Sequence, residues 1–89
     1  MELSDYRARN DQNDRQLVEL FAQRMNTAAG IAAYKKEHGL PVLDPVRERE
    51  KLLDVAAQAP EDMRDYTASL YTMLFELSRC YQGRLLGST

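Results

Sequence analysis

Residues 4–38 read SDYRARNDQNDRQLVELFAQRMNTAAGIAAYKKEH, a stretch with no proline and a single glycine, Gly30. Ser4 is suited to a helix N-cap, and Gly39, directly after the stretch, is suited to the position just beyond a helix C-terminus. Apolar residues recur at steps of three and four, which is the helical period. They are Leu17, Leu20, Phe21, Ala28, Ile31 and Tyr34. The pattern predicts one uninterrupted helix over residues 4–38.

This predicted helix is too long for its own chain to cover. At 1.5 Å per residue it spans about 50 Å, whereas a compact domain of this length has a radius of gyration of about 12 Å and is roughly 30 Å across. Its apolar stripe must therefore be buried against another chain. We expect an intertwined homodimer in which the long first helices of two copies pair.

A second, shorter helix is predicted after a proline-containing loop. Asp44 is suited to an N-cap, and Pro45 then occupies the first helical position, where its missing N–H costs nothing. The apolar residues that follow continue to about Gln58, and Pro60 breaks the pattern. We expect a helix over residues 45–58.

The third helix is predicted to begin at Glu61 and Asp62, since acidic residues favour a helix N-terminus. Its apolar residues have heptad-like spacing. They are Met63, Tyr66, Leu70, Met73, Leu74, Leu77, Tyr81 and Leu85. The fold class is therefore all-α, a single domain over residues 1–89 with three helices at about 4–38, 45–58 and 61–86.

Composition excludes several classes of protein. The chain has 89 residues, 44% of them hydrophobic, and a net charge of −2, which gives no electrostatic basis for binding nucleic acid. No apolar run approaches the roughly 20 residues that span a bilayer, and the N-terminus lacks the features of an export signal. One cysteine, Cys80, and one histidine, His38, cannot form a disulfide or a structural zinc site. We expect a cytoplasmic domain with no metal, in which Cys80 is a small core residue and His38 lies at the surface of a helix end.

Two cations stand out on the first helix. Arg24 and Lys35 are eleven residues apart, which places them within about 20° on the same face and about 16 Å apart along the axis. Their side chains could close around a ligand with two anionic ends, although Arg24 could also extend past the core to solvent. Arg7 lies about 25 Å before Arg24 and can reach such a pocket only from the partner in an antiparallel dimer.

Two uncharged hydrogen-bonding side chains stand out on the third helix. Ser78 and Gln82 are four residues apart and therefore neighbours on one helix face, close to its apolar stripe. The sequence contains no familiar arrangement of a nucleophile and its base.

Several segments together resemble the all-helical, type II chorismate mutase family over nearly the whole chain. Residues 35–50, KKEHGLPVLDPVRERE, resemble the family's lysine-containing helix end, loop and Asp-x-x-Arg-Glu start of the second helix. Arg7, Asp14, Leu17, Leu20 and Arg24 follow its first-helix pattern. Residues 78–82, SRCYQ, resemble its Ser-x-x-x-Gln signature. Asn10 and Asn13 depart from the pattern, because the family usually has apolar side chains there.

The resemblance implies a cytoplasmic isomerase of the shikimate pathway that serves aromatic amino acid biosynthesis. It would rearrange chorismate to prephenate, a pericyclic shift that needs no metal, cofactor or covalent intermediate. Carried over residue by residue, Arg24, Ser78 and, from the partner subunit, Arg7 would hold the substrate carboxylates. Lys35 would reach the ether oxygen of the breaking bond and a carboxylate, and Gln82 would donate to the same oxygen.

The resemblance also assigns the start of the second helix to the substrate's ring hydroxyl. Glu48 and the main chain of Asp44 would bind this hydroxyl, and Arg47 would line that end of the site. Chorismate and prephenate are then the expected small-molecule partners, in a homodimer that binds neither nucleic acid nor membrane.

Two other functions fit the same helices. One is an isochorismate–pyruvate lyase of the same fold, although the loop over residues 40–45, LPVLDP, looks more like that of a mutase. The other is a non-catalytic dimerisation or regulatory module. Domains of this family also occur joined to prephenate dehydratase, prephenate dehydrogenase or the first shikimate-pathway synthase, so a free-standing enzyme and one part of a longer chain both fit the sequence.

Overall fold

The computed structural model describes residues 1–87 and is all-α over that range, with no strand, as the sequence predicts. Its elements are α1 (Leu3–Glu37), α2 (Pro45–Gln58), the 3-10 turn η1 (Glu61–Met63) and α3 (Arg64–Leu85). Residues 88 and 89 of the expected 1–89 domain lie outside the described part. Within residues 1–87, no helix has the combination of length and apolar composition that crossing a membrane requires.

The ends of α1 differ in how well the sequence predicted them. The expected N-cap at Ser4 was wrong: the N-cap is Glu2, whose backbone N–H donates to the Asp5 carboxylate at 2.8 Å. The C-terminal end is confirmed, because Gly39 has a φ of +66°, in the left-handed region that glycine favours. The N–H of Gly39 and that of Leu40 bond back to carbonyls of the last turn, at 3.4 and 2.8 Å.

The start of α2 is confirmed, and that of α3 needs a small correction. Asp44 is the N-cap of α2, its Oδ1 accepting from the Arg47 backbone N–H at 3.1 Å, with Pro45 at the first helical position. The third helix was expected from residue 61, but residues 61–63 form a 3-10 turn in which the Met63 N–H reaches the Pro60 carbonyl at 2.8 Å. Short 3-10 turns commonly lead into α-helices.

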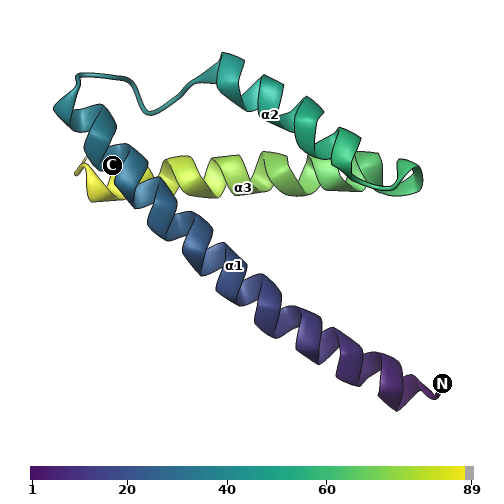
Figure 1. Ribbon diagram of the computed structural model, residues 1–89. Helices are drawn as coiled ribbons and strands as arrows, with labels where there is room; N and C mark the ends of the chain where they lie inside the picture. Colours follow the sequence, from purple (N-terminus) through teal and green to yellow (C-terminus); the bar gives the residue numbers. More distant parts are fainter. Residues whose placement is uncertain (88–89) are drawn as a thin grey trace.

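The helices meet in an open arrangement in which α3 packs against both α1 and α2. Figure 1 shows α2 running along α3. The C-terminal part of α1 crosses α3 near the C-terminal end of α3, and the N-terminal part of α1 extends away from both helices. The buried apolar core is small: Ala28, Ala32, Val55 and Phe75. The alanines of α1 have the short side chains that let another helix approach closely, and Ala32 is only 1% exposed.

The packed face of α3 differs from its apolar stripe. Phe75 and Gln82, seven residues apart, are its buried residues, whereas Leu70, Met73 and Leu77 of the stripe are exposed. The expectation that Cys80 lies in the core was also wrong, because its side chain is exposed. Cys80 is five residues after Phe75 and so points about 140° away from the packed face.

His38 lies at the surface, as expected for a residue at the end of a helix. Its ring stacks on Tyr34 with centroids 3.9 Å apart, and Nδ1 lies 2.9 Å from the Tyr34 carbonyl oxygen. Through these two contacts the His38 side chain packs on the last turn of α1.

All residues in the N-terminal half of α1 are exposed to solvent in the described chain. The described residues extend 54 Å along their longest axis, with a radius of gyration of 16.1 Å, against about 12 Å for a compact domain of this size. Leu17 is 59% exposed and Leu20 60% exposed. The prediction that this chain leaves the long helix uncovered is therefore confirmed.

Two glycines give a matched test of these helix assignments. Gly30 lies inside α1 and a Cβ there would meet nothing within 4 Å, so Gly30→Ala should stabilise the protein by about 1 kcal/mol. Gly39→Ala should destabilise it by about 1–2 kcal/mol, because its φ of +66° strains any residue with a Cβ. Thermal unfolding at one fixed protein concentration measures both. Equal shifts for the two variants would contradict the assigned C-terminus of α1.

Candidate active site

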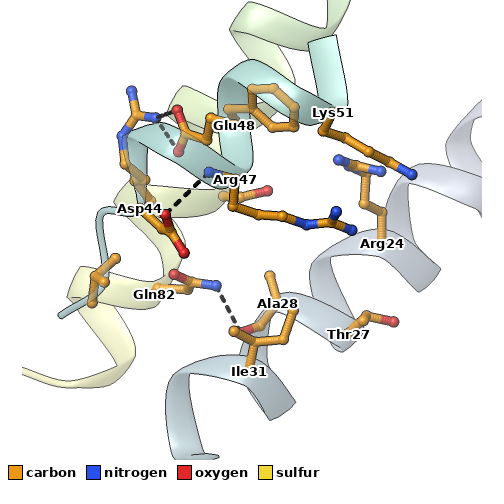
Figure 2. A pocket seen from close by; sticks show the side chains of 13 residues that line it. Arg24, Thr27, Ala28, Ile31, Asp44, Arg47, Glu48, Lys51 and Gln82 are labelled. Atoms are coloured by element: carbon orange, nitrogen blue, oxygen red, sulfur yellow. Dashed lines mark hydrogen bonds and ion pairs between the residues drawn. The ribbon is translucent and has the colours of Figure 1, made fainter. Parts of the chain in front are cut away.

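A cavity of about 240 Å³ lies where the C-terminal half of α1, the start of α2 and the C-terminal half of α3 meet. Figure 2 shows side chains from all three helices facing it. The residues that line it are Arg24, Thr27, Ala28, Ile31, Val42, Asp44, Arg47, Glu48, Lys51, Phe75, Ser78, Arg79 and Gln82. Six residues that the sequence analysis assigned to the site thus share one cavity: Arg24, Asp44, Arg47, Glu48, Ser78 and Gln82.

The cavity wall is positively charged although the chain as a whole is not. Its cationic side chains are Arg24, Arg47, Lys51 and Arg79, and its acidic ones are Asp44 and Glu48. The wall therefore has a formal net charge of +2, whereas the whole chain has −2. Figure 2 shows the charged ends of Arg24, Arg47 and Lys51 extending toward the same side of the cavity. Converging like charges repel one another unless an anion lies between them, so the wall is suited to an anionic ligand.

Arg24 is held by the aromatic rings of α3. Its guanidinium carbon lies 5.1 Å from the centroid of Tyr71 and 5.8 Å from that of Phe75, within the range of cation–π attraction. Its Nε is buried and has no hydrogen-bond partner among residues 1–87. A buried N–H without an acceptor is unfavourable, and an anion bound in the cavity can supply that acceptor.

Gln82 places a neutral donor deep in the same cavity. The residue is 6% exposed, and its amide nitrogen donates to the Ala28 carbonyl oxygen at 3.1 Å. This hydrogen bond joins α3 to α1 and fixes the amide, as the dashed line in Figure 2 shows. Since an amide NH₂ has two N–H groups, the second remains for a ligand. Ser78, one turn earlier on α3, lines the same wall.

The start of α2 contributes two acidic residues that already have partners. Asp44 caps the helix, so one carboxylate oxygen is occupied by the Arg47 backbone N–H. Glu48 accepts from Arg79 on α3, whose Nη1 lies 2.5 Å from Oε1 and 2.6 Å from Oε2. These contacts fix both carboxylates at the rim of a site that otherwise attracts anions.

Lys35 and Arg7, also assigned from the sequence, lie outside the cavity wall. Lys35 is half-buried, and its Nζ donates to the carbonyl oxygen of Val42, a residue of the wall, at 2.8 Å. The ammonium is thereby held over the loop between α1 and α2. Arg7 is exposed and belongs to the N-terminal part of α1, and Figure 1 shows this part of the helix extending away from the other helices.

The sequence analysis did not identify several residues of the wall. Among them are two further charged residues, Arg79 and Lys51. The Nζ of Lys51 also lies 3.5 Å from Oδ2 of Asp54. Helical spacing could have found some of them, because Thr27, Ala28 and Ile31 follow Arg24 by three, four and seven residues, and Lys51 follows Arg47 by four. No local pattern indicates the pairing of Arg79, because its partner is 31 residues away.

The arrangement suits the binding and electrostatic stabilisation of an anion. Across residues 1–87, no three His, Cys, Asp or Glu side chains are grouped so that they could hold a metal ion. What the site offers is fixed cationic and amide donors around a small cavity, which can bind an anion and stabilise negative charge that develops on it.

The chain is thus a small all-α protein in which three helices surround a cationic cavity with a buried amide, an arrangement suited to an anionic molecule. The comparison with family models is more specific: the model for chorismate mutase type II matches residues 6–83, and the chain belongs to that family. It is also 41% identical to the T-protein of Haemophilus influenzae over 46 residues, which are 52% of this chain and 12% of that protein. The match thus covers about an eighth of the relative's length. No solved structure matches the chain significantly.

Proposed function

We propose that this chain is a chorismate mutase that rearranges chorismate to prephenate. The observation that carries the proposal is the charge of the cavity wall, where four cationic side chains and two carboxylates surround the buried amide of Gln82. Chorismate is a dianion, and a wall with an excess of positive charge attracts it. Membership of the chorismate mutase type II family supports the same substrate.

The reaction is a pericyclic shift in which the ether bond breaks as a carbon–carbon bond forms. Negative charge grows on the ether oxygen in the transition state, so donors already fixed near that oxygen lower the barrier. Gln82 supplies one, since its amide is held by the Ala28 carbonyl and has a second N–H. Lys35 supplies the other, because its ammonium has three N–H groups and Val42 uses one.

Arg24 and Ser78 bind a substrate carboxylate, and the rim of α2 binds the ring hydroxyl through Glu48 and the Asp44 main chain, with Arg47 beside them. Holding both ends of a flexible molecule selects its compact reactive conformer. An acceleration of 10⁶ requires about 8 kcal/mol, and one fixed donor contributes about 3–4 kcal/mol. Two donors together with conformer selection can therefore supply the free energy that an acceleration of about 10⁶ requires.

We further propose that the active form is a homodimer in which α1 of one copy covers α1 and α3 of the other. A second, largely apolar cavity of about 560 Å³ lies between the middle of α1 and the N-terminal half of α3. Its lining residues are Leu17, Val18, Leu20, Phe21, Arg24, Leu70, Tyr71 and Leu74. Arg24 lines both cavities, so a helix seated in the apolar one would reach the edge of the charged one.

An antiparallel pairing of the two α1 helices brings Arg7 of the partner subunit to this edge. If Arg7 lies opposite Arg24, the twofold axis passes between Arg15 and Gln16, midway along the chain between the two arginines. The exposed Asn10 and Asn13 then lie along the interface, where polar side chains can fix the register of paired helices. Arg7 would add a further positive charge for a substrate carboxylate.

A direct assay tests the proposed activity. The purified chain should consume chorismate, with loss of its ultraviolet absorbance, and form prephenate. Pyruvate released from isochorismate, with no prephenate from chorismate, would instead indicate the lyase. A dimer with neither turnover nor binding of a transition-state analogue would indicate a non-catalytic module.

Lys35→Ala should lower kcat by about 10²–10³-fold, because it removes one fixed donor from the ether oxygen. Lys36→Ala is the matched control, since Lys36 is the next residue of α1 but is exposed, and it should leave turnover nearly unchanged. Steady-state kinetics with both variants measures the difference. Full activity in Lys35→Ala would rule out the proposed role of the ammonium.

Gln82→Glu should confine activity to acidic pH. A carboxylate only accepts hydrogen bonds, whereas a protonated carboxyl has one O–H, so the variant can donate to the ether oxygen only while the carboxyl is protonated. It cannot at the same time make the donation to the Ala28 carbonyl that the amide makes. Activity is thus present at low pH and is lost as pH rises through the pKa of the new carboxyl. The unaltered enzyme, with a neutral amide, should keep a flat profile. A variant as active at pH 8 as at pH 5 would show that Gln82 does not contact the ether oxygen.

Mixed dimers test whether Arg7 acts across the interface. Arg7→Ala and Lys35→Ala should each impair turnover. When the two are unfolded, mixed in equal amounts and refolded, about a quarter of the wild-type sites should return, because half of the dimers are mixed and each has one intact site. No recovery would mean that Arg7 does not serve the partner's site.

A further inference from the structure

The ion pair between Glu48 and Arg79 is a feature of the site that the proposed mechanism has not used. Arg79 donates through Nη1 to both carboxylate oxygens of Glu48, at 2.5 and 2.6 Å. The Arg79 side chain is 34% exposed and that of Glu48 25%, so the pair is partly shielded from water. It joins α2 to α3 at the cavity wall, to which both residues belong.

The position of Arg79 on α3 directs it toward the site. It follows Ser78 by one residue and precedes Gln82 by three, which places it about 60° around the helix from Gln82. It therefore shares the packed face with two residues of the proposed site, while Cys80 points away. The Ser-x-x-x-Gln pattern leaves residue 79 unspecified, so the role of Arg79 is inferred from its contact with Glu48 in the structure.

A hydrogen bond to both oxygens has two consequences for Glu48. It restricts a side chain that would otherwise sample several rotamers, and charge-assisted contacts to two atoms also fix its orientation. Each oxygen keeps a further lone pair that can accept a hydrogen bond from a hydroxyl group. The guanidinium also balances a negative charge that would otherwise repel a dianion at the rim of the site.

We infer that Arg79 is a positioning residue: it holds the Glu48 carboxylate in the orientation that accepts the ring hydroxyl of the substrate and offsets its charge. The inference rests on the proposed function, because it concerns the same site and the same substrate. Arg79 acts through Glu48, so removing it should matter only while Glu48 is present.

A double-mutant cycle on the full chain tests this dependence. Arg79→Gln should lower kcat/KM for chorismate about tenfold, mainly through KM, since the hydroxyl contact forms on binding. In the Glu48→Gln background the same change should have less than about a twofold effect, because no carboxylate remains to position. Arg84→Gln, at an exposed arginine on the same helix, is the control and should leave kcat/KM unchanged both with Glu48 and in the Glu48→Gln background.

Two further measurements separate positioning from a structural role. With a dianionic chorismate analogue that lacks the ring hydroxyl, Arg79→Gln should lower kcat/KM less than it does with chorismate, because only the unbalanced charge of Glu48 then acts on the ligand. Arg79→Lys keeps the charge but loses the planar group, so it should recover part of the activity, and it also serves as the folded variant if Arg79→Gln is unstable. Thermal unfolding of each variant records its stability.

Equal losses in both Glu48 backgrounds would overturn the inference, since Arg79 would then act on the substrate directly or on the fold. Unchanged kcat/KM in Arg79→Gln would overturn it as well. Either result, obtained with normal turnover by the unaltered chain, leaves the proposed function intact. No turnover by the unaltered chain would overturn the proposed function and this inference with it.

Discussion

Four cationic side chains share a cavity of about 240 Å³ with only two carboxylates, and both carboxylates already have partners. Repulsion among the cations is the constraint that the rest of the site must satisfy. Three of the four cations have separate partners: Arg24 contacts two aromatic rings, Arg79 pairs with Glu48, and Lys51 pairs with Asp54. In the proposed function, a bound dianion would lie among these cations and reduce their mutual repulsion.

The same contacts that anchor the charges also hold the helices together. The hydrogen bond from Gln82 to Ala28 joins α3 to α1, and the Arg79–Glu48 pair joins α3 to α2. The buried apolar core is small, and these polar links join the helices beside it. Site geometry and fold stability are therefore coupled, and in the proposed dimer the second copy would supply the apolar burial that one chain lacks.

The sequence predicted the helices well, because their ends depend on local chemistry. Asp44, Pro45 and Gly39 specify caps that act within one turn. Ser4 failed as a cap because the pair of Glu2 and Asp5 forms one two residues earlier. The family resemblance assigned six residues that line the cavity.

What the sequence did not reveal depends on which helix faces pack together. The stripe from Met63 to Leu85 is more regular than the face that carries Phe75 and Gln82, yet the second face is the buried one. Cys80 was misplaced for the same reason. The pairing of Arg79 with Glu48 and the bond from Lys35 to the Val42 carbonyl depend on side chains meeting across a loop or between helices, which periodicity does not encode.

The charge balance of the cavity can be tested most directly by calorimetric titration of a stable dicarboxylate that mimics the compact conformer of chorismate, alongside its monomethyl ester. The dianion should bind at least about tenfold more tightly than the monoanion, and its advantage should shrink as salt is added. Equal affinities at all salt concentrations would contradict the claim that this site is built around two negative charges.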